Sequence, residues 1–117
     1  ILAPGLEQAE IERRRHIVEG LERFFIGKGL IRSAGAGKEE ILRAALAYLA
    51  MSPSRFVLAN LEDLWLEIKS QNLPGTAGNR NWRRKTRYGL EEFKAMPEVA
   101  GRLREVNRLR KGTEKRK

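Results

Sequence analysis

The stretch Phe56-Val57-Leu58-Ala59 is the part of the sequence that indicates the fold class. A short, nearly continuous apolar run with residues that favour strands is typical of a strand buried on both faces of a parallel sheet. It follows a segment over 38–51 whose apolar residues form one helical face, and Ser52-Pro53 separates the two. A helix that leads into a buried strand is typical of α/β proteins. The sequence therefore predicts an α/β fold, mostly helical in this chain, with one short buried strand at about 56–59.

Helical spacing recurs on both sides of this predicted strand. Upstream, apolar residues spaced by seven, three and four positions predict a helix over 7–25, and Gly27 and Gly29 are expected to end it. Downstream, Asn60 is expected to cap a short helix that reaches Ile68. Further helices are predicted over 90–95 and 98–110. Residues 112–117 contain no apolar side chain and are expected to be disordered.

Composition excludes several classes of protein. The 117 residues suffice for one domain or a piece of a larger one. The chain has no cysteine and a single histidine, His16, so disulfides, thiolate zinc sites and cysteine nucleophiles are excluded from it. No apolar run approaches the roughly 20 residues that cross a bilayer. The glycine-rich segment 33–38 has neither the leading glycine nor the Ser or Thr of a phosphate loop.

The positive charge is concentrated in the last third of the chain. Residues 1–79 hold ten basic and ten acidic side chains, whereas residues 80–117 hold fourteen basic and five acidic ones and carry the whole net charge of +9. Such a block attracts phosphate, an anionic surface or an acidic partner, or it is a solvated end that keeps the protein soluble.

No catalytic set of residues is recognisable. Catalysis by carboxylates needs two or three of them at one bond, but the glutamates of the first 40 residues lie among arginines at solvated helical positions. Glu62 and Asp63 are adjacent, and we expect Asp63 to be a helix cap or the ion-pair partner of an arginine. One histidine far from any Gly-flanked serine gives no Ser-His-Asp triad. We therefore expect no catalytic residue in this chain.

The most specific pattern is Asn72-Leu73-Pro74-Gly75-Thr76, followed after a short spacer by Asn81-Trp82-Arg83-Arg84-Lys85. Pro74-Gly75 predicts a tight turn. The two motifs in this order closely resemble the C-terminal signature of the 4-α-glucanotransferases, also called amylomaltases or disproportionating enzymes. Upstream, Leu61-Glu62-Asp63-Leu64 resembles a family segment in the same order, and the likeness covers about residues 38–94.

The resemblance implies a retaining enzyme with a (β/α)8 TIM barrel. Such an enzyme cuts an α-1,4 linkage in a maltodextrin and passes the glycosyl part to the 4-hydroxyl of another glucan. By likeness to the family, its three catalytic residues lie on earlier barrel strands, before Ile1. Because such a barrel needs about 250 residues and the sequence opens on Ile1, we expect a C-terminal fragment that is inactive by itself.

The resemblance also divides the chain. Residues 1–95 are expected to form the C-terminal part of the catalytic barrel, with a substrate-side loop over 70–85, and residues 96–117 a basic helix with a disordered tail. Loops that follow barrel strands gather on the catalytic face. The loop therefore supplies the candidates for substrate binding, which are Asn72, Pro74, Gly75 and Trp82.

Each candidate has a chemical reason and an alternative. The amide of Asn72 donates and accepts hydrogen bonds, so it suits sugar hydroxyls or a scaffold role in the loop equally well. Pro74 and Gly75 would set the backbone path. Trp82 can stack on a pyranose, although a buried indole that anchors the loop to the barrel is the more frequent role. Arg83 and Arg84 are expected to bind carboxylates or carbonyls of the barrel, because a neutral sugar offers them no charge.

The expected partners are an α-1,4-glucan and the missing N-terminal portion of the barrel, in a cytoplasmic enzyme without metal, cofactor or membrane contact. The alternative is a small basic helical nucleic-acid-binding module that places its last arginines and Lys111 on phosphates. Aromatic residues are sparse after Trp82, which makes nucleic acid the less favoured partner. A third interpretation is a structural helical partner that docks through the apolar stripe of residues 11–25.

Overall fold

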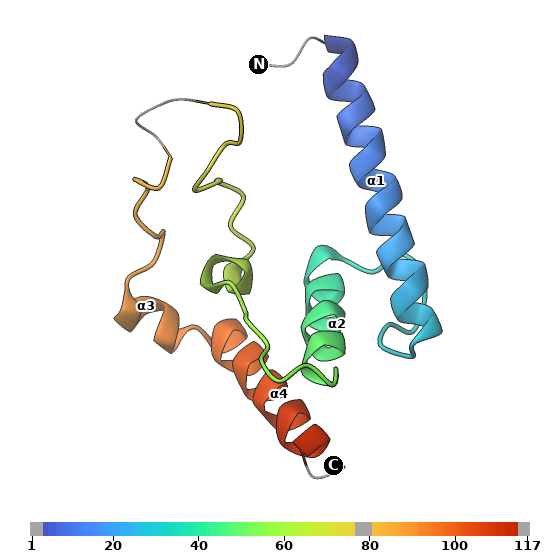
Figure 1. The fold of residues 1–117 in the computed structure, drawn as a ribbon, viewed down its shortest axis with the longest axis vertical. Coiled ribbons are helices and arrows are strands. Elements are labelled where there is room, and N and C mark those ends of the chain that lie inside the picture. The colour runs from blue at the N-terminus through green and yellow to red at the C-terminus, as the bar shows by residue number, and fades with distance from the viewer. Residues whose placement is uncertain (1–3, 77–80, 115–117) are drawn as a thin grey trace. The chain divides into compact units, whose positions relative to one another are not determined.

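The computed structural model describes residues 4–76 and 81–114, which are mostly helical (Figure 1). Four α-helices span Pro4–Gly27 (α1), Lys38–Ala50 (α2), Leu90–Ala95 (α3) and Pro97–Glu114 (α4) within these residues, and a 3₁₀ helix (η1) spans Leu61–Trp65. The chain divides into two compact units, Ile1–Leu49 and Ala50–Lys117. The helices predicted over 7–25, 38–51 and 90–95 are confirmed.

The first unit has its core at the C-terminal end of α1. Phe25, Ile31 and Ala44 are buried there, with exposed fractions of 3%, 3% and 0%. Phe24 meets the ring of Phe25 edge to face at 5.5 Å and that of Tyr48 at 5.1 Å, a favourable geometry for aromatic pairs. These contacts attach α2 to the last turns of α1.

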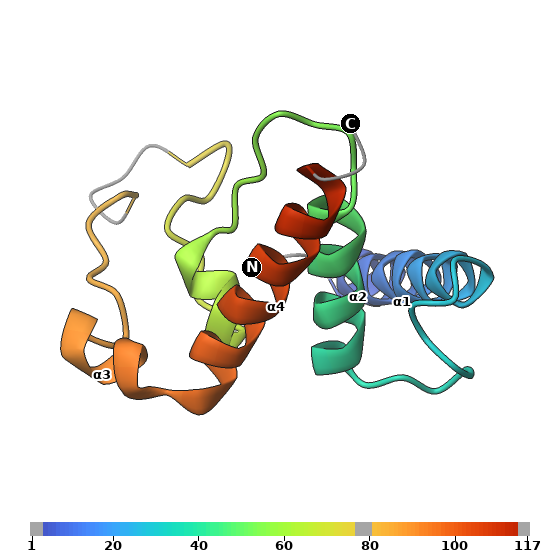
Figure 2. The ribbon, with the colours of Figure 1, turned by 90° about the horizontal axis from the view of Figure 1, so that it is seen from below.

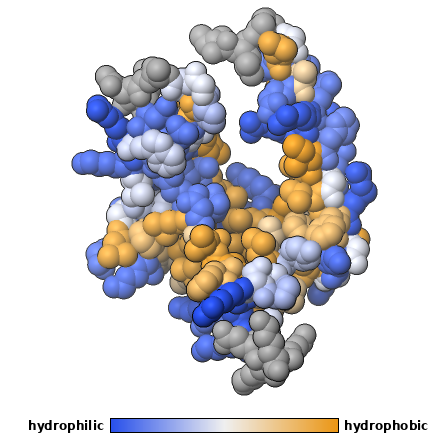
Figure 3. All heavy atoms as spheres, viewed as in Figure 1, coloured by the Kyte–Doolittle hydropathy of each residue, from blue (hydrophilic) through white to orange (hydrophobic). Residues whose placement is uncertain are grey.

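The apolar stripe of α1 is less buried toward its N-terminal end. Leu6, Ile11, Ile17 and Val18 are 61%, 47%, 51% and 47% exposed, and Figure 3 shows apolar atoms at the surface of this helix. The periodicity therefore predicts the helix correctly but predicts more burial than the first unit provides.

The end of α1 follows the predicted glycine chemistry. Gly29 has a φ of 70°, and the N–H of Leu30 donates to the carbonyl of Phe25 at 2.9 Å. Glycine adopts this left-handed backbone without steric cost, which ends the helix. In the glycine-rich connector that follows, the N–H of Ala36 donates to a carboxylate oxygen of Glu22 at 2.6 Å. Residues 33–38 were not expected to form a phosphate loop. One of their backbone amides binds a carboxylate of the same chain.

The second unit is organised by α4. This helix packs on η1 and on α3 (Figures 1 and 2). Leu64 of η1 and Val99 of α4 are 2% and 1% exposed, and the guanidinium of Arg102 donates to the carbonyl of Leu64. Trp65 meets the ring of Tyr88 edge to face at 5.4 Å. The long helix therefore fixes the position of η1, whose side chains build the site described below.

The predicted buried strand is wrong for this structure. The described residues contain no strand, and 56–59 have no regular secondary structure. Phe56 and Leu58 are 77% and 90% exposed, so the predicted burial fails as well. A strand needs a neighbouring strand to satisfy its backbone hydrogen bonds. Apolar composition favours the strand but cannot supply that neighbour.

Two other element boundaries differ from the prediction. The helix after Asn60 ends at Trp65, because Leu66 takes a left-handed φ of 57°, and Ile68 is 90% exposed. Helix α4 continues to Glu114, so the expected disorder is wrong for 112–114, whereas 115–117 lie outside the described residues. Among the described helices, none combines the length and apolar character that crossing a bilayer requires.

Candidate functional site

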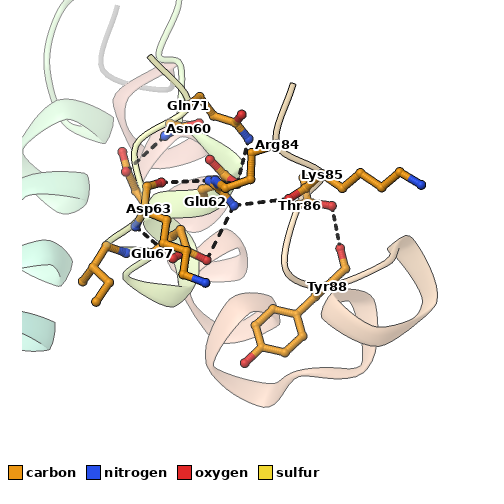
Figure 4. A network of polar contacts seen from close by, with 11 residues as sticks. Asn60, Glu62, Asp63, Glu67, Gln71, Arg84, Lys85, Thr86 and Tyr88 are labelled. Atoms are coloured by element: carbon orange, nitrogen blue, oxygen red, sulfur yellow. Dashed lines mark hydrogen bonds and ion pairs between the residues drawn. The ribbon is translucent and has the colours of Figure 1, made fainter. Parts of the chain in front are cut away.

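Arg84 binds two carboxylates and two backbone carbonyls next to η1 (Figure 4). Its Nη2 donates to Glu62 Oε1 at 2.7 Å and to the carbonyl of Lys69 at 2.8 Å. Its Nη1 donates to the carbonyl of Lys85 at 3.2 Å and lies 3.9 Å from Glu67 Oε2. Gln71 Nε2 also donates to Glu62 Oε1, at 3.2 Å. We call Glu62, Glu67, Gln71 and Arg84 the Arg84 cluster.

The Arg84 cluster is largely shielded from water. The side chains of Arg84, Glu62 and Glu67 are 22%, 13% and 4% exposed. Charge-assisted hydrogen bonds are stronger when water is excluded, because the effective dielectric constant is lower there. Since Glu62 precedes the 70–85 loop and Arg84 lies at its end, the ion pair closes the loop at its base.

Glu67 joins the cluster because the chain turns back after η1. The left-handed Leu66 places the N–H of Glu67 on the carbonyl of Glu62 at 3.1 Å. Glu67 Oε1 then accepts the N–H groups of Ile68 and Lys69, both at 3.0 Å. The hydrogen bond from the Lys69 backbone, with the charges of Arg84 and Arg87, holds the pKa of Glu67 below its ordinary value of 4.5 although burial opposes this. Glu67 is therefore ionised at neutral pH.

The predicted turn at Pro74-Gly75 is confirmed. The N–H of Thr76 donates to the carbonyl of Leu73 at 3.2 Å, and Gly75 has a φ of 81°. A type II turn requires this positive φ at its third residue, which explains the glycine after the proline. The hydroxyl of Thr76 donates to the same carbonyl of Leu73 at 2.7 Å. The local hydrogen bond expected of Thr76 is therefore present.

Asn81 is the side chain that closes the loop across this turn. Its Oδ1 accepts the N–H of Leu73 at 3.0 Å, and its Nδ2 donates to the carbonyl of Thr76 at 3.0 Å. One amide therefore binds both ends of the turn, because it carries a donor and an acceptor. Asn81 therefore has a scaffold role in the loop, and the role of Asn72 stays a prediction. Asn72, Pro74 and Gly75 are exposed in the loop that Asn81 holds.

Trp82 is exposed rather than buried. Its side chain is 75% exposed, its φ is 62°, and its N–H donates to the carbonyl of Gln71 at 2.7 Å. Within residues 1–117 the indole is therefore exposed, and its anchoring to the rest of the barrel stays a prediction. A left-handed backbone at a bulky residue costs on the order of 1–3 kcal/mol and persists only where the surrounding structure imposes it.

A cavity of about 400 Å³ lies beside the Arg84 cluster. We call it the carboxylate pocket, and it is lined by Asn60, Glu62, Asp63, Glu67, Ile68, Lys69, Ser70, Gln71 and Trp82. Its carboxylates and amides provide hydrogen-bond acceptors and donors, and the indole provides an apolar face. This combination suits a ligand with hydroxyl groups at its edge and C–H groups on its face.

The roles of Glu62 and Asp63 in the structure differ from those that the sequence predicts. Asp63 Oδ1 accepts from Asn60 Nδ2 at 3.1 Å, whereas Glu62 and Glu67 are the ion-pair partners of Arg84. The side chain of Asn60 caps no backbone N–H of η1. Arg84 binds carboxylates and carbonyls, as expected, although they come from this chain. No local signal in the sequence identifies Glu67 or Gln71 as its neighbours.

Three of the four arginines of α4 have structural partners in the second unit. Arg110 donates to the carbonyls of Ser52 and Arg55, both at 3.2 Å, and Arg102 donates to that of Leu64. Arg108 forms an ion pair with Glu105 at 2.9 Å. These contacts explain part of the basic excess without an external anion, and they leave fewer cations for the nucleic-acid face that the alternative interpretation requires.

Metal-binding potential is limited in the part of the chain that the structure describes. No three acidic or histidine side chains gather closely enough there to hold a metal ion.

Comparison with models of protein families gives a match over most of the chain. The family model for 4-alpha-glucanotransferase, glycoside hydrolase family 77, matches residues 8–91. No curated protein and no solved structure matches the chain. The matched range covers more than half of the sequence and contains the Arg84 cluster, the 70–85 loop and the carboxylate pocket. From this match we conclude that the chain belongs to the 4-alpha-glucanotransferase family.

Proposed function

We propose that the chain is the C-terminal part of a cytoplasmic enzyme that transfers α-1,4-glucan segments between maltooligosaccharides. The observation that carries this proposal is the family match over residues 8–91. The carboxylate pocket supports it, because its hydrogen-bonding groups and the exposed Trp82 suit a sugar ring.

The proposed chemistry is a double displacement at the anomeric carbon. A carboxylate attacks this carbon while a second carboxylic acid gives its proton to the departing 4-oxygen of the glucan. The 4-hydroxyl of an acceptor glucan then attacks the glycosyl ester, its proton passes to the second carboxylate, and the first carboxylate is released. We propose that these groups lie upstream of this chain, so that residues 1–117 alone are inactive.

In this proposal, residues 1–95 complete a (β/α)8 barrel and 96–117 form a basic C-terminal extension. In this barrel, neighbouring strands from the upstream portion would cover Phe56 and Leu58, which are 77% and 90% exposed in residues 1–117. The 70–85 loop then lies on the substrate side, where Asn72 bonds sugar hydroxyls. Pro74 and Gly75 shape the loop, and Trp82 stacks on a sugar ring.

The test of the activity uses the full-length enzyme and maltotriose. We expect free glucose together with chains longer than maltotriose, without phosphate or nucleotide, and chromatography of the products measures both. An enzyme that produces neither product contradicts the proposal.

The test of the site uses Asn72→Ala in the same enzyme. We expect transfer to fall about tenfold, because one or two hydrogen bonds to the sugar are lost. Stability should change by less than about 0.5 kcal/mol, because Asn72 is exposed. Asn107→Ala on the exposed side of α4 is the matched control and should leave transfer unchanged. Unfolding of the Asn72→Ala variant would instead assign Asn72 to the loop scaffold.

A further inference from the structure

A second cavity shares Glu67 and Lys69 with the carboxylate pocket, and most of its lining residues are basic. It measures about 360 Å³ and is lined by Glu67, Lys69, Arg84, Lys85 and Arg87. We call it the cationic pocket. Its volume lies in the range of about 300–1,000 Å³ that is typical of small-molecule sites. A neutral glucan offers no charge to four cations, so the proposed function does not explain this pocket.

The cations of this pocket differ in whether a carboxylate pairs with them. Arg84 is bound by Glu62 and Glu67, at 2.7 and 3.9 Å. Within the described residues, no carboxylate lies within ion-pair distance of Lys69, Lys85 or Arg87.

The charges of the pocket and of the Arg84 cluster do not cancel. Lys69, Arg84, Lys85 and Arg87 carry four positive charges, and Glu62 and Glu67 carry two negative charges, which leaves a net charge of +2. The guanidinium carbon of Arg87 lies 5.4 Å from the centroid of the Tyr88 ring, a cation–π distance that restrains the side chain. The pocket is therefore concave, basic and partly organised before any ligand arrives.

We propose that the cationic pocket binds the phosphate group of a small phosphate monoester, with Lys69, Lys85 and Arg87 around it. A phosphate monoester carries a charge of about −1.5 to −2 and three strong acceptor oxygens, which match these donors. The cations surround a single cavity, whereas nucleic acid is contacted through a row of backbone phosphates. The observed arrangement therefore favours one compact anion.

The test measures binding to the full protein by isothermal titration calorimetry with three probes: inorganic phosphate, glucose 6-phosphate and glucose. We expect both phosphates to bind and glucose alone not to bind in this pocket. Tighter binding of glucose 6-phosphate than of inorganic phosphate assigns the site to a sugar phosphate, and equal binding assigns it to the phosphate group alone. Either result supports the proposal.

Variants locate the binding. Lys85 and Arg87 are exposed, so their joint replacement, Lys85→Gln with Arg87→Gln, should leave the fold intact and weaken phosphate binding about tenfold or more. Lys94→Gln with Arg104→Gln removes the same charge from exposed sites on α3 and α4, and affinity should stay within about twofold.

Three results would overturn the proposal: no binding of either phosphate, equal losses in the two double variants, or an oligonucleotide that binds more tightly than glucose 6-phosphate and displaces it. Equal losses of phosphate affinity would show that phosphate is attracted by the overall charge of the protein. Displacement of glucose 6-phosphate by the oligonucleotide would show that the surface binds nucleic acid. The measurement needs no turnover. A protein that does not disproportionate maltotriose can therefore still pass this test, and the two proposals fail separately.

Discussion

Replacing Arg84 by methionine tests whether the Arg84 cluster holds the 70–85 loop in place. Methionine keeps much of the apolar stem but removes the guanidinium that binds Glu62 at 2.7 Å and the carbonyls of Lys69 and Lys85 at 2.8 and 3.2 Å. The substitution leaves Glu62, which is 13% exposed, without its cation. A shielded carboxylate that loses its partner keeps the cost of its desolvation, so the variant should be clearly less stable.

The expected loss for Arg84→Met is about 2–4 kcal/mol. Net hydrogen bonds to charged groups contribute about 1.5–3 kcal/mol each, and breaking a fully buried pair costs about 3–5 kcal/mol. The lower part of the combined range applies because Arg84 is 22% exposed, so water can partly solvate the Glu62 carboxylate once the guanidinium is gone.

Denaturant unfolding of the full protein measures this loss, and Arg83→Met is the matched control. Arg83 is the exposed neighbour in the sequence, so its replacement should change stability by no more than about 0.5 kcal/mol. A double-mutant cycle with Glu62→Gln should return a coupling energy of about 1–3 kcal/mol between the two side chains. If Arg84→Met destabilises the protein no more than Arg83→Met does, the ion pair does not hold the loop.

Two further predictions concern Glu67 and the segment over 56–59. Because the pKa of Glu67 is lowered from 4.5, the stability it provides is complete above that pH and is lost as the pH falls through the lower folded-state value. Glu67→Gln should therefore reduce the fall of the denaturant midpoint as the pH drops below 4.5, and an unchanged acid limb would show that other groups cause it. Leu58→Ala should reduce the stability of the full-length enzyme by about 2–5 kcal/mol if barrel strands bury this side chain. Leu64→Ala should cause a loss of the same size. A cost for Leu58→Ala below about 0.5 kcal/mol, as for an exposed residue, would contradict the buried barrel strand.

The sequence predicted the parts of the site that depend on near neighbours. The turn at Pro74-Gly75 follows from the restricted φ of proline and the positive φ of 81° that glycine allows. The family follows from two spaced motifs in the correct order. The sequence did not predict that Asn81 rather than Asn72 bridges the turn, because either amide has the required donor and acceptor.

The sequence by itself determined the helices over 7–25, 38–51 and 90–95, the glycines that end the first of them and the tight turn, because these depend on contacts between residues only a few positions apart. Tertiary structure alone decided that Arg84 pairs with Glu62, 22 residues away, and that Glu67 joins them through the left-handed Leu66. It also left 56–59 without a strand. The physical reason is common to these cases: an ion pair or a strand needs a partner distant in sequence, and the composition of one segment does not specify where that partner lies.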